Sequence, residues 1–386
     1  MRIGAMIGAD GTKDSIADVV RLGKEIEAAG LDHVWLANIF SYDAITTLAL
    51  IGHETSRVRV GTAVTPTYPR HPGALAQQAM RPELLREFKG QHLSNTAWAF
   101  ATAGHASPEL FKTISAEAVR RRIGGFKEQA LSITAWAFAT AGHAAPELFD
   151  AISAEAMRRR LGGFTEQNLS ITAWAFATAG HKSPELFNAI SAEVVRRRFG
   201  GFTQQDMSNI AWAFAVLEPP SADELFGTAT FTTRCAQFET SFSHEELAQL
   251  HQWSLWLDER GALWPRLPES LRQACRHAFV EGEVGPSQLQ SDVVLEIRSR
   301  VAHVKEEHRC ETSGYSIDAV VTFDNGNKVA VEVDGPYHFL GRSQQPTGAT
   351  LLKQRQLRYF GWRLESVAYW EWDRSKELHW LSKSCR

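Results

Sequence analysis

The chain has 386 residues, of which 44% are hydrophobic and 22% charged, and its formal net charge is −3. This length suffices for two or three domains, and the charge balance excludes a polycation, so any nucleic-acid site must be a local basic patch. The four cysteines include no Cys-x-x-Cys pair, and no apolar run reaches the ~18 residues of a membrane span. We therefore expect a protein of a reducing compartment, without a cysteine metal site and without a membrane partner.

Residues 1–80 alternate strand and helix patterns. Helices are predicted at 15–30 and 43–56, with a third beginning at 71–80. Strands are predicted at 1–8, 33–38 and 58–66. This βαβαβ order predicts parallel strands joined by helical crossovers.

The segments EAAGLDHVWLAN, GHETSRVRVGTAVTP and PRHPGALAQQA resemble the opening of luciferase-like monooxygenases, in particular their deazaflavin-dependent bacterial members. The resemblance implies a fragment of a (β/α)₈ barrel that binds flavin or deazaflavin at its strand ends, where Asn38 and Thr65 would face the cofactor. Only three of the eight strands are present, so we expect neither a complete oxidoreductase site nor a required cofactor. The abrupt change of pattern after Met80 also fits a fusion or a joined gene model.

Residues 81–218 repeat every 38 residues, which predicts an all-α superhelical array, an α-solenoid, of stacked helix pairs. The first helix of a unit runs through EQNLSITAWAFATAG and ends at a glycine. The second runs through PELFNAISAEVVRRR. Each helix-ending glycine precedes a histidine (His105, His143, His181), for which turn capping is favoured over metal binding because no further ligands recur. The period is marked by Trp98, Trp136, Trp174 and Trp212, by Phe88, Phe126, Phe164 and Phe202, and by Gln91, Gln129, Gln167 and Gln205.

Three arginines end the second helix of three successive units, at Arg120–Arg122, Arg158–Arg160 and Arg196–Arg198. Stacking would align them into a basic ledge able to neutralise consecutive phosphates of a single strand. The alternative is that they complement the helix dipole and cap free carbonyls.

Two positions near the start of the first helix vary between otherwise copied units. In helical-repeat RNA binders of the pentatricopeptide and Pumilio type, a few side chains per unit contact one base. These positions are therefore candidates for base contacts, and the alternative is drift at solvated sites. The first position holds His92, Ala130, Asn168 and Asp206, and the second holds Asn95, Ile133, Ile171 and Asn209.

Residues 219–302 are predicted to be a helical connector whose Trp253, Trp256 and Trp264 pack a core. Residues 303–386 change to an α/β pattern. Strands are predicted at 315–323, 328–339 and 363–373, with a turn at 325–327 and a helix at 347–361.

The 38-residue unit with Leu-Ser-x-Thr-Ala-Trp-Ala-Phe-Ala resembles the octotricopeptide repeat. The C-terminal segment, with Tyr315, Asp318, VAVEVDGPYHF, LLKQRQLRYFGW and YWEW, resembles the RAP domain. FAST-kinase-like mitochondrial proteins share this layout. The resemblance implies a protein that binds single-stranded organellar RNA, with other RNA-processing proteins as further partners. It also implies a mitochondrial or chloroplast location. The N-terminus carries no clear presequence, so the cytoplasm stays open.

The RAP domain in turn resembles very-short-patch-repair-type endonucleases of the PD-(D/E)XK fold. Such enzymes place two carboxylates on adjacent strands around Mg²⁺, with a lysine beside the attacking water. Asp318 and Glu332 match the two acidic positions, but Asp334 stands where the lysine belongs, and Lys353 or Gln354 would replace it. The alternative is that Asp318, Glu332 and Asp334 form a pocket that is structural or binds RNA ends. His338, near the end of the strand, is a further candidate for a phosphate contact.

Overall fold

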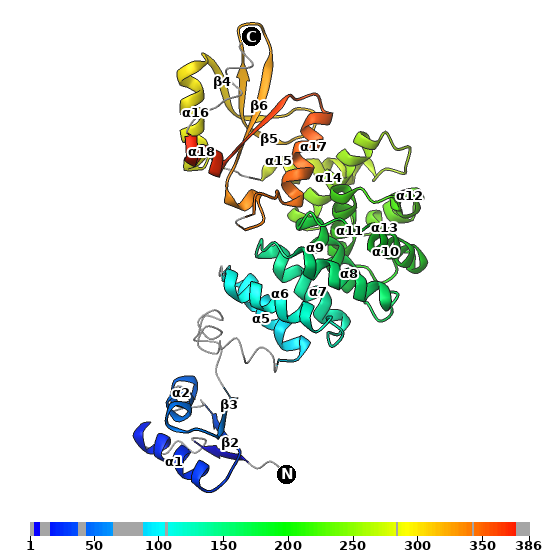
Figure 1. Ribbon diagram of the computed structural model, residues 1–386. Helices are drawn as coiled ribbons and strands as arrows, with labels where there is room; N and C mark the ends of the chain where they lie inside the picture. Colours follow the sequence, from blue (N-terminus) through cyan, green and yellow to red (C-terminus); the bar gives the residue numbers. More distant parts are fainter. Residues whose placement is uncertain are drawn as a thin grey trace. The chain divides into compact units, whose positions relative to one another are not determined.

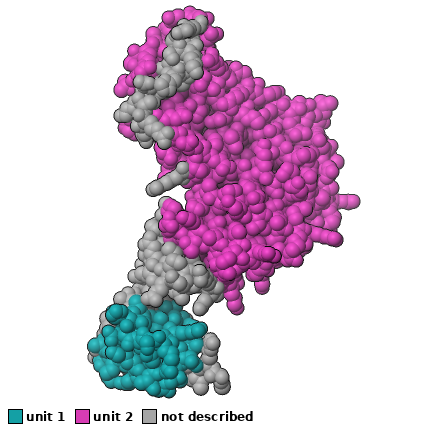
Figure 2. Space-filling view, viewed as in Figure 1, with its two compact units in different colours: residues 1–87 teal, residues 88–386 magenta. Residues whose placement is uncertain are grey.

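The computed structural model describes residues 4–7, 16–37, 44–64, 88–104, 107–282, 285–341 and 343–375. The chain forms two compact units, residues 1–87 and residues 88–386, which Figure 2 colours separately. Each unit has its own core, and each is described by itself.

The first unit is a three-stranded parallel sheet with strand order β1-β2-β3, as the βαβαβ pattern predicts. Val34 and Leu36 of β2 pack under Leu48 and Ile51 of α2, and these side chains are almost fully buried. The predicted cofactor residues Asn38 and Thr65, and the predicted helix at 71–80, lie outside the described residues. The elements are β1 (Gly4–Ile7), α1 (Ile16–Ala28), β2 (His33–Ala37), α2 (Ala44–Glu54) and β3 (Arg59–Val64).

The second unit begins with two rows of helices that alternate along the chain (Figure 1). Neighbours in the first row pack much more closely than neighbours in the second row, because their contact faces are rich in alanine. The first row comprises α5 (Gly90–Thr102), α7 (Glu128–Thr140), α9 (Glu166–Thr178) and α11 (Gln204–Leu217). The second row comprises α6 (Pro108–Arg120), α8 (Pro146–Arg158), α10 (Pro184–Arg197) and α12 (Ala222–Phe226).

The sequence sets the ends of these helices. Proline at the first position starts α6, α8 and α10, where its missing N–H costs nothing. Gly104, Gly142 and Gly180 follow the first-row helices with φ of 61, 62 and 60°, a left-handed conformation that glycine adopts without strain.

Connector helices close the end of the two rows. Trp253 and Trp256 of α14 are fully buried and pack with Phe226 and Phe231, so the predicted core role of these two tryptophans is confirmed. Trp264 joins the same cluster, with its ring centroid 6.0 Å from that of Phe226. The connector helices are α13 (Thr230–Gln237), α14 (His244–Arg260) and α15 (Glu269–Glu281).

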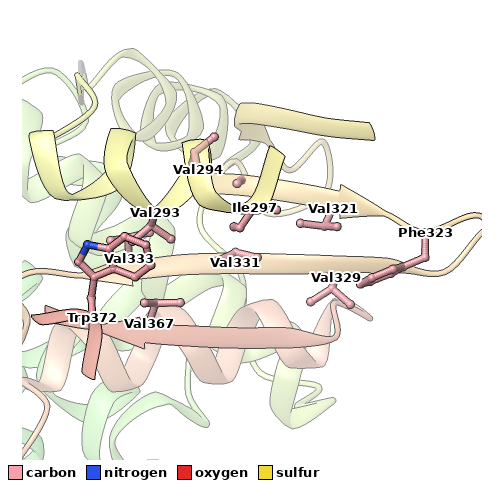
Figure 3. Packing of buried hydrophobic residues seen from close by; sticks show 11 residues of the cluster. Val293, Val294, Ile297, Val321, Phe323, Val329, Val331, Val333, Val367 and Trp372 are labelled. Atoms are coloured by element: carbon pink, nitrogen blue, oxygen red, sulfur yellow. The ribbon is translucent and has the colours of Figure 1, made fainter. Parts of the chain in front are cut away.

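The C-terminal segment is a four-stranded sheet of order β4-β5-β6-β7, antiparallel except for the parallel pair β6/β7. Helix α16 covers one face, where Val293 and Ile297 pack on valines of β5, β6 and β7 (Figure 3). Helices α14 and α17 cover the other face through Leu255 and Leu357. The elements are α16 (Gln288–Arg300), β4 (His303–Arg309), β5 (Ser316–Thr322), β6 (Lys328–Asp334), the 3₁₀ turn η1 (Pro336–His338), α17 (Gly348–Tyr359), β7 (Leu364–Ala368) and α18 (Tyr369–Ser375).

One sequence expectation for this sheet was wrong, and one strand was not predicted. The strand predicted at 363–373 ends at Ala368, and the segment YWEW begins helix α18, whose Trp372 packs into the sheet core. Strand β4 was missed, because its run HVKEEHR is charged and its side chains are exposed or half-buried at the sheet edge.

Helix α17 joins the C-terminal sheet to the helical rows. Arg355 donates to the Val216 carbonyl at the end of α11 (3.0 Å) and to Glu259 of α14 (2.7 Å). Gly348 lies so close to α9 that a Cβ built on it would stand 1.8 Å from the Ala177 carbonyl oxygen. The sheet therefore packs against the C-terminal ends of the first-row helices.

Candidate nucleic-acid interface

One side of each first-row helix stays open. Along α7 three residues that are not buried, Gln129, Ile133 and Trp136, follow the spacing i, i+4, i+7, which is one stripe of a helix. The other residues of α7 that are not buried are Glu128 and Thr140 at its two ends. The same stripe recurs on α5 and α9, and we call the three stripes together the tryptophan face. It comprises Gln91, Asn95, Trp98, Gln129, Ile133, Trp136, Gln167, Ile171 and Trp174.

The tryptophan face closes at the fourth unit. Trp98 is 48% exposed and Trp136 and Trp174 are half-buried, whereas Trp212 is only 5% exposed. The Trp212 indole N–H donates to Gln252 Oε1 of α14 at 2.9 Å, and its ring lies 6.4 Å from that of Trp174. Three tryptophans therefore remain available on the open side, and α14 covers the fourth.

The first variable position is buried in three of the four units, at Ala130, Asn168 and Asp206. Asn168 and Asp206 are 6% and 4% exposed, and each forms a capping box with Thr165 or Thr203 at the start of its helix. His92 is exposed, but its Nδ1 accepts from the Lys89 N–H at 3.4 Å. The base-contact role expected for Asn168 and Asp206 is thus corrected to helix capping, because buried side chains cannot touch a strand on the surface.

The second variable position does lie on the tryptophan face. Asn95 is exposed, and Ile133 and Ile171 are half-buried. Asn209 is 9% exposed, and its Oδ1 accepts from Gln249 Nε2 of α14 at 3.2 Å.

The arginine triplets divide into three kinds of side chain. The middle arginines (Arg121, Arg159, Arg197) are 23, 16 and 16% exposed. Arg159 binds Glu155 of its own helix, Glu128 of α7 at 2.7 Å, and the Phe126 carbonyl at 2.8 Å. Arg197 repeats these contacts one unit later. These arginines join the two helices of a unit. For them the contacts favour the alternative, in which the arginines bind carbonyls at helix ends, over a basic ledge that binds phosphates.

The first arginines (Arg120, Arg158, Arg196) are 60, 68 and 69% exposed, and each makes a two-point contact with a glutamate three residues earlier. Hydrogen bonds from these arginines lower the pKa of Glu117, Glu155 and Glu193 to about 2. Their positive charge is therefore largely balanced.

The third arginines (Arg122, Arg160, Arg198) are exposed and adopt left-handed backbone with φ of 53, 51 and 51°. This turn lets the next residue bury its apolar side chain: Leu161 donates its N–H to the Ala156 carbonyl at 3.1 Å. Across the described ranges the third arginines have no acidic partner within salt-bridge distance. They are the uncompensated charges of each triplet.

We call the arginines of the three triplets the arginine row. Its middle arginines contact groups at or just before the starts of the first-row helices, where each open stripe begins. Arg159 contacts Glu128, and Glu128 precedes Gln129, the first residue of the open stripe. The repeated histidines follow the C-terminal ends of the first-row helices, opposite to the ends that the arginines contact. His143 stacks on Phe111 with ring centroids 5.6 Å apart, and burial lowers its pKa. His181 contacts Asp150 at 2.9 Å, whereas His105 lies outside the described residues.

The C-terminal sheet brings the nuclease-like residues together. Lys353 Nζ of α17 lies 2.5 Å from Glu332 Oε2 of β6, and Asp318 on the neighbouring strand β5 accepts from the Val333 N–H at 2.7 Å. Burial raises the pKa of Asp318, and it raises that of Glu332 to about 7. Glu332 Oε1 has no hydrogen-bond partner in the described part of the chain.

Asp334 belongs to a second, structural group. It contacts His338 Nδ1 at 3.0 Å and Gln354 Nε2 at 3.2 Å, and it accepts from the Ser366 hydroxyl. Burial disfavours the charge of Asp334, but the bonds from His338 and Ser366 outweigh it and lower the pKa. The contact with Asp334 raises the pKa of His338. These bonds join β6, β7, η1 and α17.

These residues do not fit the Mg²⁺ site implied by the nuclease resemblance. A divalent cation needs several free oxygen ligands. Here Lys353 lies beside Glu332, as the resemblance implies, but Asp334 binds His338, Gln354 and Ser366, so only Asp318 and Glu332 remain as acidic groups. In the described ranges, no three His, Cys, Asp or Glu side chains are grouped so that they could hold a metal ion.

Sequence reasoning missed the open stripe. Its signal was present, because an invariant Gln and an invariant Trp seven residues apart lie on one helical face. No pattern pointed to α14 as the element that closes the face.

Known protein families match segments at both ends of the chain. The RAP domain family matches residues 331–381, so the C-terminal segment carries a RAP domain. The luciferase-like monooxygenase family matches residues 1–81.

A chloroplastic RAP domain-containing protein of Oryza sativa subsp. japonica is 40% identical over 60 residues, which is 16% of this chain and 9% of the relative. The chain thus matches less than a tenth of the length of that protein. Among the described residues, no helix has both the length and the apolar character needed to cross a bilayer.

Proposed function

We propose that the chain binds single-stranded RNA along the tryptophan face and acts in the processing, stability or translation of organellar transcripts. The helical rows would be an α-solenoid of the octotricopeptide type, continued by the RAP domain. The observation that carries the proposal is the open ladder of Trp98, Trp136 and Trp174 on the first-row helices. The exposed third arginines, which have no salt-bridge partner within the described ranges, add to it. The chloroplastic RAP relative supports an organellar location, in a chloroplast or a mitochondrion.

Indoles that reach the surface suit a single strand because every base has a π-face on which an aromatic ring can stack. A single apolar side chain at a protein surface is ordinary, whereas a regular row of aromatic side chains marks a binding surface. Asn95, Ile133 and Ile171 lie one turn from the tryptophans and would bias the sequence that is bound.

The third arginines would contact the phosphates. They are exposed and have no salt-bridge partner among the residues that the structure describes, whereas the first and middle arginines bind glutamates. An uncompensated cation gains most from a phosphate, because it has no intramolecular partner to lose.

Two other functions are not proposed. The RAP domain brings Asp318, Glu332 and Lys353 together, but within the described residues no third metal-binding side chain is grouped with them, so RNA cleavage is not proposed. The first unit has three strands of a barrel within the described residues, and an oxidoreductase site of that family needs loops from many more. RNA-processing proteins remain expected partners.

The test is the salt dependence of RNA affinity in the full chain. Replacing Arg122, Arg160 and Arg198 together with glutamine removes three charges and leaves a polar side chain at each position. The slope of log affinity against log salt should fall by about 0.7 per lost phosphate contact on a single strand, so by about 2 in all. A control replaces Lys112, Lys182 and Lys328, three exposed lysines outside the arginine row, with glutamine. An unchanged slope in the arginine variant, or an equal fall in the control, would contradict the phosphate role.

A further inference from the structure

A cavity of about 400 Å³ lies where the tryptophan face ends against α14. Its lining includes Trp136, Trp174 and Asn209 from the first-row helices. It also includes Glu245, Glu246 and Gln249 from the start of α14, which together with Asn209 we call the rim. The volume is within the range of small-molecule pockets, and the aromatic walls with a few polar groups are typical of them.

Hydrogen-bond acceptors dominate this rim. Glu246 Oε2 accepts from the Ser243 N–H at 2.8 Å, which leaves Oε1 available. Asn209 Oδ1 accepts from Gln249 Nε2 at 3.2 Å, so the Gln249 carbonyl oxygen stays available as well. A hydrogen bond from its own backbone lowers the pKa of Glu245, which keeps that carboxylate charged at neutral pH.

Two carboxylates exclude a phosphate, so a strand that enters this cavity must present a base. The Watson–Crick edge of guanine carries two adjacent donors, N1–H and the N2 amino group, which one carboxylate can accept together. Adenine and cytosine offer one amino group beside acceptors, and uracil offers a single imino N–H between two carbonyls. The rim therefore matches guanine best.

We propose that this cavity is a guanine-binding pocket that terminates the tryptophan face and fixes the register of the bound RNA. The inference rests on the proposed function, because the base reaches the pocket as part of a strand stacked on Trp136 and Trp174. The connector helix α14, outside the repeats, would then supply base selectivity that the nearly identical units lack.

The experiment measures binding of the full chain to nine-nucleotide oligouridylates at one salt concentration. Each RNA carries a single guanosine, adenosine or cytidine at the first, middle or last position. One guanosine position should raise affinity about tenfold over the all-uridine RNA, within the ~5- to 150-fold range of a bidentate base contact, and adenosine or cytidine there should raise it less. The variant E245Q/E246Q should lose the preference, because a neutral amide carries its own donor and accepts more weakly than a carboxylate.

The matched control is E147Q/E185Q, which removes two exposed carboxylates from the starts of α8 and α10. It corrects for the general gain in RNA affinity when negative charge is removed, and it should keep the guanosine preference. RNA binding with equal affinity for all four bases, or a guanosine preference that survives in E245Q/E246Q, overturns the pocket alone. Failure to bind any of these RNAs overturns the proposed function itself.

Discussion

Each arginine of a triplet has its own task, although the three are chemically identical and adjacent. The middle one faces the neighbouring helix, the first lies along its own helix on a glutamate, and the third turns into left-handed backbone. The division follows from where the helix ends. Sequence reasoning found the triplets but could not divide them, because the final residue of a helix is set by the buried Leu161 and its equivalents.

The middle arginine should matter for stability and the first should not. Arg159→Ala leaves Glu155, Glu128 and the Phe126 carbonyl without their partner in a partly buried site, so we expect a loss of about 2–4 kcal/mol in the free energy of unfolding. Arg158→Ala removes an exposed ion pair and should cost less than ~1 kcal/mol. Denaturant unfolding followed by circular dichroism measures both, and equal losses would refute the assignment.

The glutamates paired with these arginines predict acid sensitivity. Their folded pKa of about 2 lies below the ordinary value of 4.5, so the stability they contribute is fully present above about pH 4.5. It is lost as the pH falls from there toward 2, because protonation must then break the contacts with arginine.

The measurement is the free energy of unfolding between pH 7 and pH 2. Glu155→Gln should be less stable than the wild type at pH 7, and the difference should shrink toward pH 2. Glu147→Gln, an exposed neighbour on α8, is the control and should follow the wild-type curve. A difference between Glu155→Gln and the wild type that stays constant with pH would show that the pair carries no pH-dependent stability.

At the scale of elements, periodicity predicted the helices and most strands. The Gly and Ser-Pro signals located the starts and stops of the repeated helices, and alternating apolar residues located β5 and β6. The misses have physical causes. Strand β4 is charged and lies at an edge, YWEW is aromatic and so reads as a strand although α18 uses it to bury Trp372, and the capping role of Asn168 depends on where its helix begins.

The contact between α17 and α9 depends on a glycine. Gly348→Ala would place a methyl group 1.8 Å from the backbone oxygen of Ala177, so the two helices must separate. We expect a loss of about 1–3 kcal/mol in the free energy of unfolding, the range of overpacked sites. Thermal unfolding measures this loss of stability. Limited proteolysis shows whether the chain between α14 and α17 becomes more accessible to cleavage. The control is Gly335→Ala, whose added Cβ meets nothing within 4 Å, and an equal loss there would contradict the packing argument.

At the scale of the whole chain, the helical rows, the connector and the RAP domain form one unit from residue 88 onward. A buried chain of hydrogen bonds runs from Trp212 through Gln252 and Tyr315 to Gln356, so the fourth repeat tryptophan serves the junction with the RAP domain. Sequence alone could divide the chain by pattern, but it could not predict this use of Trp212, because the tryptophan looks identical in all four units. The tryptophan face therefore extends over three units, although the repeat tryptophan occurs in four.

The measurement that most directly tests the central claim is binding of single-stranded RNA by the full chain with Trp136 and Trp174 both replaced by alanine. Stacking of a base on an aromatic ring is worth about 1–3 kcal/mol, so the double variant should bind at least ~30-fold more weakly while the far-ultraviolet circular dichroism stays unchanged. Leu263→Ala, which removes an equally apolar but fully exposed side chain away from the face, should bind as the wild type does. Wild-type affinity in the double variant would contradict the account, because RNA would then lie elsewhere on the protein.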